Sequence, residues 1–233
     1  PVLQVSHLAG GAVRDLTFAV SPGECLVLQD LDNRIFGDLL AILQGERPVE
    51  RGEIRLRGAP FQCAPTRDLA ILKEQPADAM LFSKMSYFDN LFFTIDHRLP
   101  GLWRNRRMQE GLQRTLGAEY EELFGVRLEQ LTKMEKYDLV YHRIRFQNPG
   151  VLFCMQPFKG ADVGLRKHIW NLLEGLMRQG MAVVILAVNL ADALSLASRL
   201  IRIHKDGPDE VYEQRDFAKI PFSAPWLDLY RQR

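Results

Sequence analysis

The residues between a predicted buried strand and a predicted helix raise the first question of chemistry. Cys25 to Gln29 is a short apolar run typical of a buried strand, and Leu39 to Leu43 places apolar residues at helical spacing. A glycine-rich loop at such a junction binds phosphate, because glycines let backbone N–H groups approach the oxygens and a lysine neutralises them. Here the junction reads Asp30-Leu31-Asp32-Asn33-Arg34-Ile35-Phe36-Gly37, with one glycine and no lysine.

The composition is that of an ordinary globular protein. Of 233 residues, 47% are hydrophobic and 25% are charged, which argues against disorder, and the length allows one large α/β domain with an insert or two small domains. The 30 Lys and Arg against 29 Asp and Glu give a net charge of +1, so no overall field would attract nucleic acid or an anionic membrane. The longest apolar run, Met181 to Val188, is too short to span a bilayer. We therefore expect a cytoplasmic protein with no nucleic-acid partner and no direct membrane insertion.

The cysteines and histidines give no sign of a metal site or a disulfide framework. Cys25, Cys63 and Cys154 form no C-x-x-C pair, and two of them lie in apolar runs, which favours buried reduced thiols. The histidines show none of the usual metal-ligand spacings. They are His7, His97, His142, His168 and His204. We expect no metal and no cofactor.

Alternating strands and helices predict an α/β core with a mixed or parallel sheet flanked by helices. In the first half, Leu16 to Val20 and Glu53 to Leu56 read as further strands. In the second half, an amphipathic helix is predicted over Leu165 to Met177 and a short helix over Leu190 to Ala197. The strands predicted there are Val151 to Met155, Met181 to Val188 and Leu200 to His204.

The middle of the chain has helix-like runs, such as Arg106 to Leu116 and Tyr120 to Phe124, and few strand-like ones. The C-terminal tail is rich in turn residues and ends in a predicted amphipathic turn around Trp226, Leu227 and Tyr230. The prediction is a single domain over residues 1–233, with an α/β core at 1–80 and 146–210, a helical insert at about 81–145 and a tail at 205–233.

In order and spacing, these pieces resemble the nucleotide-binding domain of ABC transporters over about residues 1 to 210. The chain is most similar to the C-terminal half of sugar-importer ATPases that carry two such domains in tandem. The matching pieces are Gly23-Glu24-Cys25-Leu26, Gly52-Glu53-Ile54, Met85-Ser86 with Asn90-Leu91, and Asn148-Pro149 followed by Gly160-Ala161-Asp162-Val163-Gly164. The resemblance implies a P-loop NTPase type of core. It also implies another ABC ATPase domain as partner, in tandem or as a dimer, and a membrane permease subunit that would hold the chain at the inner face of the cell membrane.

The resemblance assigns the phosphate loop to residues that cannot do its chemistry. In gapless register, the two glycines fall on Asp30 and Ile35, the lysine on Phe36 and the Mg²⁺-binding hydroxyl on Gly37. An aspartate near the phosphate oxygens opposes binding by roughly 4 kcal/mol at about 4 Å and an effective dielectric near 20, and loss of the lysine removes a favourable interaction of similar size. We therefore expect weak nucleotide binding at most and no hydrolysis.

The other motif positions depart from the family as well. The Walker B pair falls on Met155 and Gln156, and a thioether does not suit Mg²⁺ while an amide cannot accept a proton from water. The remaining positions are Thr132, Lys133 and Met134 in the signature, Glu74 in the glutamine loop, Asp162 in the D-loop and Val188 at the switch.

The hypothesis from sequence is a degenerate ABC domain, a pseudo-ATPase that keeps its shape for pairing with a competent ATPase domain or a transport partner. Two alternatives stay open. One is an ABC ATPase that still binds ATP through an altered site, for instance with Glu74 and Lys133, and energises sugar uptake. The other is a stand-alone sensor or scaffold that binds something other than ATP.

Overall fold

The computed structural model describes residues 1–92, 111, 122–123, 125–205 and 207–220, which form two sheets and the helices around them. An antiparallel sheet has the order β2-β1-β4-β5, with β1 (Leu3–Gly10), β2 (Val13–Val20), β4 (Arg51–Leu56) and β5 (Ala59–Pro60). A larger sheet has the order β10-β9-β3-β8-β7-β6, with β3 (Cys25–Gln29), β6 (Leu69–Leu72), β7 (Val151–Met155), β8 (Ala182–Ala187), β9 (Arg199–Arg202) and β10 (Glu210–Glu213). Its neighbours are parallel except β10, which is antiparallel to β9.

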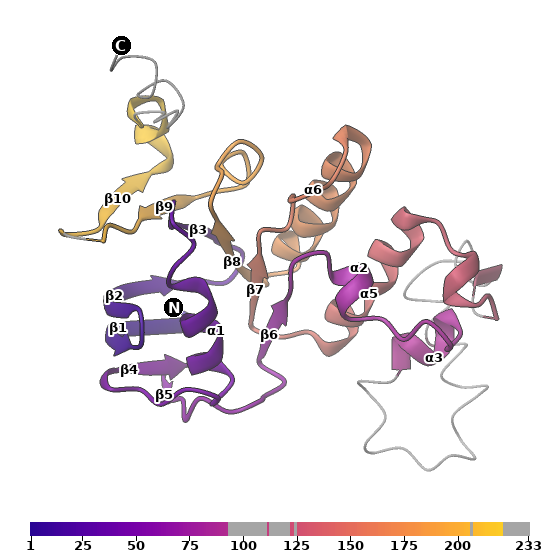
Figure 1. Ribbon diagram of the computed structural model, residues 1–233, viewed down its shortest axis with the longest axis horizontal. Helices are drawn as coiled ribbons and strands as arrows, with labels where there is room; N and C mark the ends of the chain where they lie inside the picture. The colour runs from indigo at the N-terminus through magenta and orange to yellow at the C-terminus, as the bar shows by residue number, and fades with distance from the viewer. Residues whose placement is uncertain (93–110, 112–121, 124, 206, 221–233) are drawn as a thin grey trace.

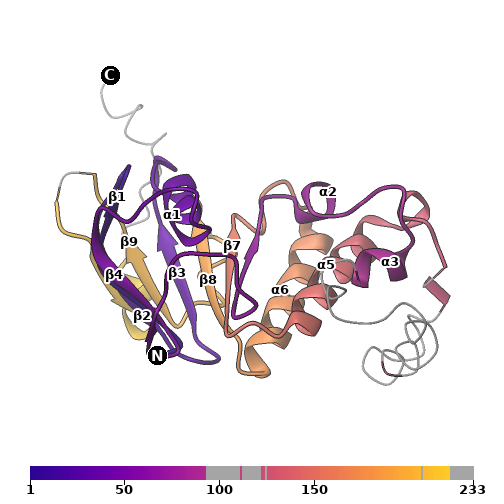
Figure 2. The same cartoon turned by 90° about the horizontal axis from the view of Figure 1, so that it is seen from below.

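Helices separate and cover the two sheets (Figures 1 and 2). Helix α1 (Phe36–Leu43) lies between them, whereas α5 (Lys133–Gln147) and α6 (Val163–Arg178) cover the other face of the larger sheet. The shorter elements are α2 (Pro76–Ala79), α3 (Tyr87–Phe92), η3 (Leu128–Gln130) and η4 (Gln214–Lys219). None of the helices in the described ranges has the length and hydrophobicity needed to cross a bilayer.

Successive side chains of β3 point into two different cores. Leu26 and Leu28 pack with α1 and the antiparallel sheet, whereas Cys25 and Val27 pack with α5 and α6. A strand covered on both faces has to be apolar at nearly every position, which explains the continuous apolar run in the sequence. Burial also raises the pKa of the Cys25 thiol to about 12, with the Glu24 carboxylate adding to the shift. This thiol therefore stays protonated and packs in the core, in line with the buried reduced thiol predicted from sequence.

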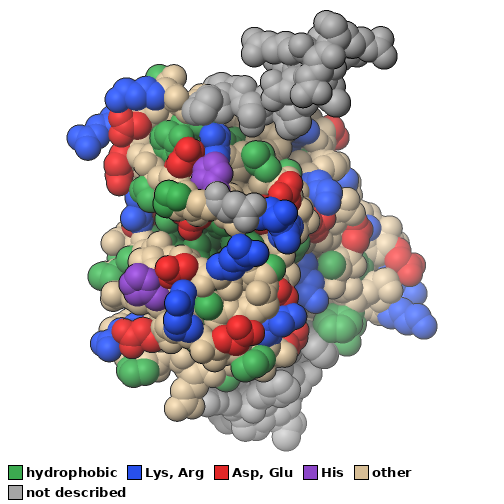
Figure 3. Space-filling model, turned by 60° about the vertical axis from the view of Figure 1, so that its left-hand side comes forward, with side chains coloured by type: hydrophobic (Ala, Val, Ile, Leu, Met, Phe, Trp, Pro, Cys, Tyr) green, Lys and Arg blue, Asp and Glu red, His purple; other side chains and the backbone are tan. Residues whose placement is uncertain are grey.

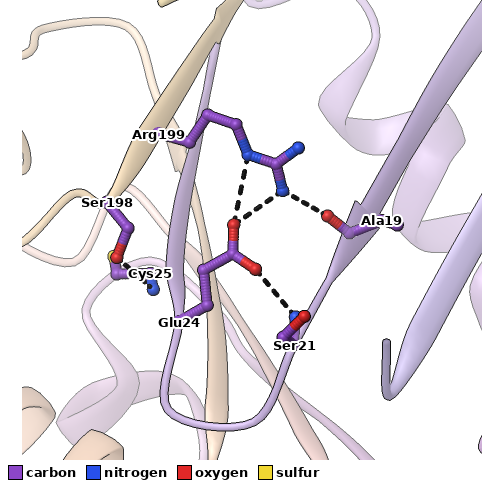
Figure 4. A network of polar contacts seen from close by, with 6 residues as sticks. All are labelled: Ala19, Ser21, Glu24, Cys25, Ser198 and Arg199. Carbon is purple, nitrogen blue, oxygen red and sulfur yellow. Dashed lines mark hydrogen bonds and ion pairs between the residues drawn. The ribbon is translucent and has the colours of Figure 1, made fainter. Parts of the chain in front are cut away.

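A polar network joins the two sheets at the amino end of β3 (Figure 4). Nε and Nη2 of Arg199 donate to Oε1 of Glu24 at 3.1 and 2.6 Å, and Nη2 also donates to the carbonyl of Ala19 in β2. The second carboxylate oxygen of Glu24 accepts the N–H of Ser21 at 2.8 Å. Since the side chains of Arg199 and Glu24 are only 23% and 19% exposed, this pair connects β9, β2 and the turn before β3 within a mostly dry environment.

One predicted helix is wrong, because Leu190 to Ala197 forms turns. The N–H of Leu194 bonds the carbonyl four residues back, but the N–H groups of Leu196 and Ala197 bond carbonyls three residues back, so no regular ladder forms. The strand predicted at Leu200 to His204 begins at Arg199 and ends at Arg202.

Other differences concern strands and boundaries that the sequence did not reveal. The antiparallel sheet with β1, and the short strand β6, were not predicted. Strand β10 and η4 lie in the segment predicted as a turn-rich tail, and α5 continues two residues past the predicted end of the insert. The helices predicted at 106–116 and 120–124, the turn around Trp226 and the side chain of His97 lie wholly or mostly outside the described residues.

Candidate functional site

The predicted motif positions gather in loops at one edge of the larger sheet. Strands β3, β8 and β7 are parallel neighbours that lie side by side in Figure 2, so their carboxyl ends meet at the same edge. The loop after β3 carries Asp30 to Gly37, the loop after β7 carries Gln156 to Asp162, and Val188 follows β8. This edge is where α/β proteins place their ligands, so these loops form the candidate site.

Asp30 fills the loop after β3 with its own carboxylate. The residue is only 6% exposed. Its Oδ1 accepts the N–H of Asp32 at 3.1 Å, and its Oδ2 accepts the N–H groups of Arg34 and Ile35 at 2.6 and 2.9 Å. Asn33 has a left-handed backbone with φ of 51°, which curls the chain so that these N–H groups converge. The carboxylate thus occupies a backbone nest of the kind that binds phosphate in other proteins.

Neither of the two residues that follow this nest supplies a ligand group. Phe36, at the position of the phosphate-binding lysine, is fully buried in the core between the sheets. Gly37, at the position of the hydroxyl, is exposed, and a Cβ added there would meet nothing within 4 Å. A side chain would therefore fit at Gly37, and the packing does not explain its absence.

A second carboxylate, on Asp38 in the first turn of α1, ties the helix to the β1–β2 turn. Its Oδ2 accepts the N–H of Ala12 at 2.6 Å, and its Oδ1 lies 3.0 Å from Nη2 of Arg47. Sequence reasoning missed this residue, because no motif marks it and its partners lie in the β1–β2 turn and in the loop after α1. The contact holds the β1–β2 turn against the start of α1.

A cleft of about 940 Å³ opens beside this loop, between the β1–β2 turn and the chain that follows β9. Its ionisable lining residues are Arg14, Asp15, Asp30, Asp32, Arg34, His204, Lys205 and Asp209. The face of the molecule in Figure 3 likewise has acidic and basic side chains interspersed. Such a lining does not concentrate positive charge in the way that a triphosphate requires.

The Walker B and glutamine-loop positions bind each other. Nε2 of Gln156 donates to Oε1 of Glu74, and Nζ of Lys159 lies 2.8 Å from Oε2 of the same carboxylate. The N–H of Gln156 donates to the carbonyl of Leu186 at 2.9 Å, which fixes the backbone at the end of β7. The Glu74 carboxylate is therefore engaged by an amide and an ammonium group from the loop after β7.

The remaining motif residues lie at the end of β7 or in the loops after β7 and β8, and they have structural contacts. Met155 packs against the core between the sheets. Oδ1 of Asp162 accepts the N–H of Leu165 at 2.8 Å and so caps α6. The carbonyl of Val188 accepts a hydrogen bond from Gln29 at 3.2 Å. Among the residues that the structure describes, no group of three His, Cys, Asp or Glu side chains could hold a metal ion.

The signature positions form the start of α5. Thr132 and Glu135 make a capping box, in which Thr132 Oγ1 accepts the N–H of Glu135 at 3.2 Å and Glu135 Oε2 accepts the N–H of Thr132 at 2.6 Å. Lys133 is exposed, and Met134 is 44% exposed. The Met134 methyl group lies 3.6 Å from the place that a Cβ of Gly164 would occupy. The structure thus brings the signature and the D-loop together.

A buried polar cluster joins α5 to α3 and α6, and sequence reasoning missed it. The Tyr87 hydroxyl lies 2.9 Å from Nδ1 of His142, and Nε2 of His168 lies 2.7 Å from a carboxylate oxygen of Asp138. Burial lowers the pKa of His142 to about 4, with Arg145 and His168 adding to the shift. No spacing in the sequence marks these residues, because each pair joins different helices.

Relatives in sequence are sugar-import proteins. The chain is 23% identical over 215 residues to the ribose import ATP-binding protein RbsA of Geobacillus kaustophilus (strain HTA426), covering 87% of this chain and 43% of that protein. It is 26% identical over 206 residues to a putative ribose/galactose/methyl galactoside import ATP-binding protein of the same organism, covering 84% and 41%. The chain thus spans less than half the length of these relatives. No protein-family model matches it.

Solved structures share the fold over the whole chain. One is cbiO1 from Clostridium perfringens, described as part of the ABC transporter complex cbiONQ, with a TM-score of 0.75, 17% identity and coverage of 100% and 99% of the two chains. Another is MJ1267, an ATP-binding cassette of an ABC transporter in its ADP conformation, with a TM-score of 0.76, 12% identity and coverage of 100% and 99%. The chain has the fold of an ABC nucleotide-binding domain, and the resemblance noted in its sequence is confirmed.

Proposed function

We propose that this chain, which has the fold of an ABC nucleotide-binding domain, does not hydrolyse ATP and serves as a structural or regulatory pairing module of an ABC-type sugar importer. The observation that carries the proposal is the Asp30 carboxylate, which accepts the N–H groups of Asp32, Arg34 and Ile35. A phosphate at this loop would need the same donors. It would therefore have to displace an anion that is covalently part of the chain.

The energetics of such a displacement are unfavourable. Hydrogen bonds to a charged acceptor contribute about 1.5–3 kcal/mol each, and a retained Asp30 carboxylate repels a phosphate by roughly 4 kcal/mol at about 4 Å. No lysine at the family's position compensates, because Phe36 lies in the core. We expect a dissociation constant for Mg-ATP in or above the millimolar range, which corresponds to a binding free energy of about −4 kcal/mol or weaker.

The residues on the other side of the site support the absence of hydrolysis. Gln156 cannot accept a proton from water, and its amide is bound to Glu74. The thioether of Met155 packs in the core and is a poor ligand for Mg²⁺. Neither residue supplies the metal-binding or water-activating group that phosphoryl transfer requires, so no nucleotide or metal cofactor is proposed.

The comparisons support the class of partner in this proposal. The relatives are named as import ATP-binding proteins for ribose, or for ribose, galactose and methyl galactoside, and cbiO1 is described as part of a transporter complex. We propose that this chain likewise pairs with another ABC ATPase domain, in tandem or as a dimer, and with a membrane permease subunit. That assembly would hold it at the cytoplasmic face of the cell membrane.

Calorimetric titration with Mg-ATP, Mg-ADP and metal-free ATP tests the proposal. The unchanged chain is expected to give no binding heat up to millimolar nucleotide. Asp30→Gly removes the internal carboxylate and is expected to bind more tightly, whereas Asp32→Gly, which removes an exposed carboxylate two residues away, is the matched control. Micromolar affinity in the unchanged chain would contradict the proposal and favour the alternative of an ATPase with an altered site.

A further inference from the structure

A small cavity lies beside β6, the edge strand of the larger sheet, and is lined by residues of α1 and α5 as well (Figure 1). Its volume is about 210 Å³. Its walls are mainly apolar, with Leu43 from α1, Ile71 from β6 and Val140 from α5 among them. An apolar cavity of about 150 Å³ in another protein accepts benzene. This cavity is therefore large enough for a small organic molecule.

Arg143, in α5, is the only ionisable side chain among the described residues that line the cavity. The residue is only 8% exposed. Its Nη1 donates to the carbonyl of Met80 at 2.5 Å, and this bond uses one of the five N–H donors of the guanidinium group. No carboxylate in the described part of the chain forms an ion pair with it. A buried cation with unused donors therefore lies at the wall of this cavity.

Two other arginines that are mostly buried do have carboxylate partners. Nη2 of Arg199 lies 2.6 Å from Oε1 of Glu24, and Nη1 of Arg202 lies 3.7 Å from Oε2 of Glu210. Burial lowers the pKa of the Arg143 guanidinium group, but an arginine side chain stays protonated in a protein. A buried charge without an opposite charge is unfavourable, so an anion that enters the cavity would remove that cost.

The chemistry of the cavity matches an organic carboxylate. The planar fork of a guanidinium group binds a carboxylate through two parallel, charge-assisted hydrogen bonds. The apolar walls suit a short hydrocarbon chain, and the described lining has no acidic side chain that would repel an anion. The cleft beside the loop after β3 differs in this respect, because acidic and basic side chains alternate in its lining.

We propose that this cavity binds a small organic carboxylate, with its carboxylate on the Arg143 guanidinium group and its hydrocarbon chain against the apolar walls. The ligand would contact α1, β6 and α5 together, and so tie α5 to the α/β core. The inference goes beyond the proposed function and does not depend on it. Leu43 is the last residue of α1, so the cavity lies at the end of this helix away from the Asp30 loop.

Titration of the full chain with hexanoate tests the inference by nuclear magnetic resonance. The amide resonances of Ala70, Val140 and Arg143 are expected to shift and to saturate, with a dissociation constant in about the millimolar range. 1-Hexanol has the same hydrocarbon chain without the charge. It is expected to bind about tenfold more weakly or less, because hydrogen bonds to a charged acceptor are stronger than those to a neutral one.

Two variants of the cavity and one control assign the binding to Arg143. Arg143→Gln removes the charge and is expected to weaken hexanoate binding about tenfold or more. Arg145→Gln makes the same charge change on an exposed residue of α5 outside the cavity, and is expected to bind hexanoate like the unchanged chain. Because Arg143→Gln also removes the bond to Met80, a second variant, Ala70→Leu, leaves Arg143 in place and fills part of the cavity. It is expected to weaken hexanoate binding as well.

Three results would overturn the inference. One is the absence of saturating shifts in the unchanged chain at tens of millimolar hexanoate. Another is equal affinity for hexanoate and 1-hexanol, which would show a purely apolar cavity in which the charge has no role. The third is unchanged hexanoate binding in both Arg143→Gln and Ala70→Leu. None of these results bears on the proposed function, which the calorimetric titration with Mg-ATP tests separately.

Discussion

The two ends of strand β3 each hold a mostly buried carboxylate, but in different ways. At the amino end, Glu24 is paired with Arg199 and so connects the two sheets (Figure 4). At the carboxyl end, Asp30 accepts only backbone N–H groups from the five residues that follow it. The first contact joins strands that are distant in the chain, whereas the second closes a single loop on itself. Only the second site uses donors that an exchangeable anion could also use.

The Glu24–Arg199 pair stabilises the fold, whereas the Asp30 carboxylate occupies the backbone N–H groups of a single loop. Loss of the Glu24–Arg199 pair would loosen the junction of β2, β3 and β9, because both charged groups are mostly buried there. Loss of the Asp30 carboxylate would leave the surrounding strands in place and free three N–H groups. The amino end should therefore respond to substitution mainly in stability, and the carboxyl end mainly in anion binding.

Arg199→Ala should have the largest effect on stability. It leaves the Glu24 carboxylate, which is 19% exposed, without its cation, and we expect the free energy of unfolding to fall by about 2–3 kcal/mol. Urea unfolding followed by circular dichroism measures the change. Arg178→Ala is the matched control, because Arg178 is 75% exposed in its pair with Glu174 and should cost less than about 0.5 kcal/mol. Equal losses of unfolding free energy in the two variants would contradict the claim that the Glu24–Arg199 pair stabilises the fold more than an exposed ion pair does.

His142 provides a third buried group, and burial disfavours its charged form. Its pKa in the folded chain, about 4, lies below the ordinary value of 6.5. The folded chain therefore binds this proton less readily than the unfolded chain. Its contribution to stability is complete above the unfolded pKa and is lost as the pH falls from 6.5 towards 4. This direction is the usual one for a histidine whose charged form is disfavoured mainly by burial.

His142→Gln measures that contribution, because glutamine does not titrate and keeps a hydrogen-bond acceptor near Tyr87. Between about pH 7 and about pH 5, the unchanged chain should lose about 2 kcal/mol more unfolding free energy than His142→Gln does. The measurement is urea unfolding at the two pH values. The same pH dependence in both chains would show that His142 is not neutralised by burial.

Asp30→Ala should have a smaller effect on stability and a specific one on anions. We expect unfolding to become easier by about 1–2 kcal/mol, because three N–H groups lose their acceptor in a loop that water can partly reach. Added inorganic phosphate should raise the melting temperature of Asp30→Ala and leave that of the unchanged chain as it was, since only a free nest gains from a ligand. If phosphate raised the melting temperature of both chains equally, it would bind at a site other than the loop after β3.

The position of the candidate loop was predictable from sequence. The binding of the Asp30 carboxylate by the N–H groups of its own loop was not. The apolar run before Asp30 and the helical spacing after Ile35 are local patterns, so they placed the strand, the loop and the helix correctly. The inward turn of the Asp30 side chain depends on the left-handed backbone of Asn33 and on three converging N–H groups. Residue types alone do not specify that path. The sequence indicated an unfavourable charge, whereas the structure places that charge within the nest itself.

Contacts between distant segments were the least predictable. Glu74 and Gln156 are 82 residues apart in the chain, and they meet because β6 pairs with β7. Strand β6 has only four residues, and a short apolar run gives no periodicity that separates a strand from a helix. Leu190 to Ala197 shows the reverse case, since its helix-like spacing reflects burial of Ala193 and Leu196 in turns that pack on the core.

The central claim is that the Asp30 carboxylate occupies the phosphate-binding nest of this chain. Amide resonances of Asp32, Arg34 and Ile35, followed by nuclear magnetic resonance during titration with Mg-ATP, test it most directly. We predict that these three resonances stay in place in the unchanged chain and shift in Asp30→Gly. Saturating shifts of all three in the unchanged chain would contradict the claim, because they would show that nucleotide displaces the carboxylate.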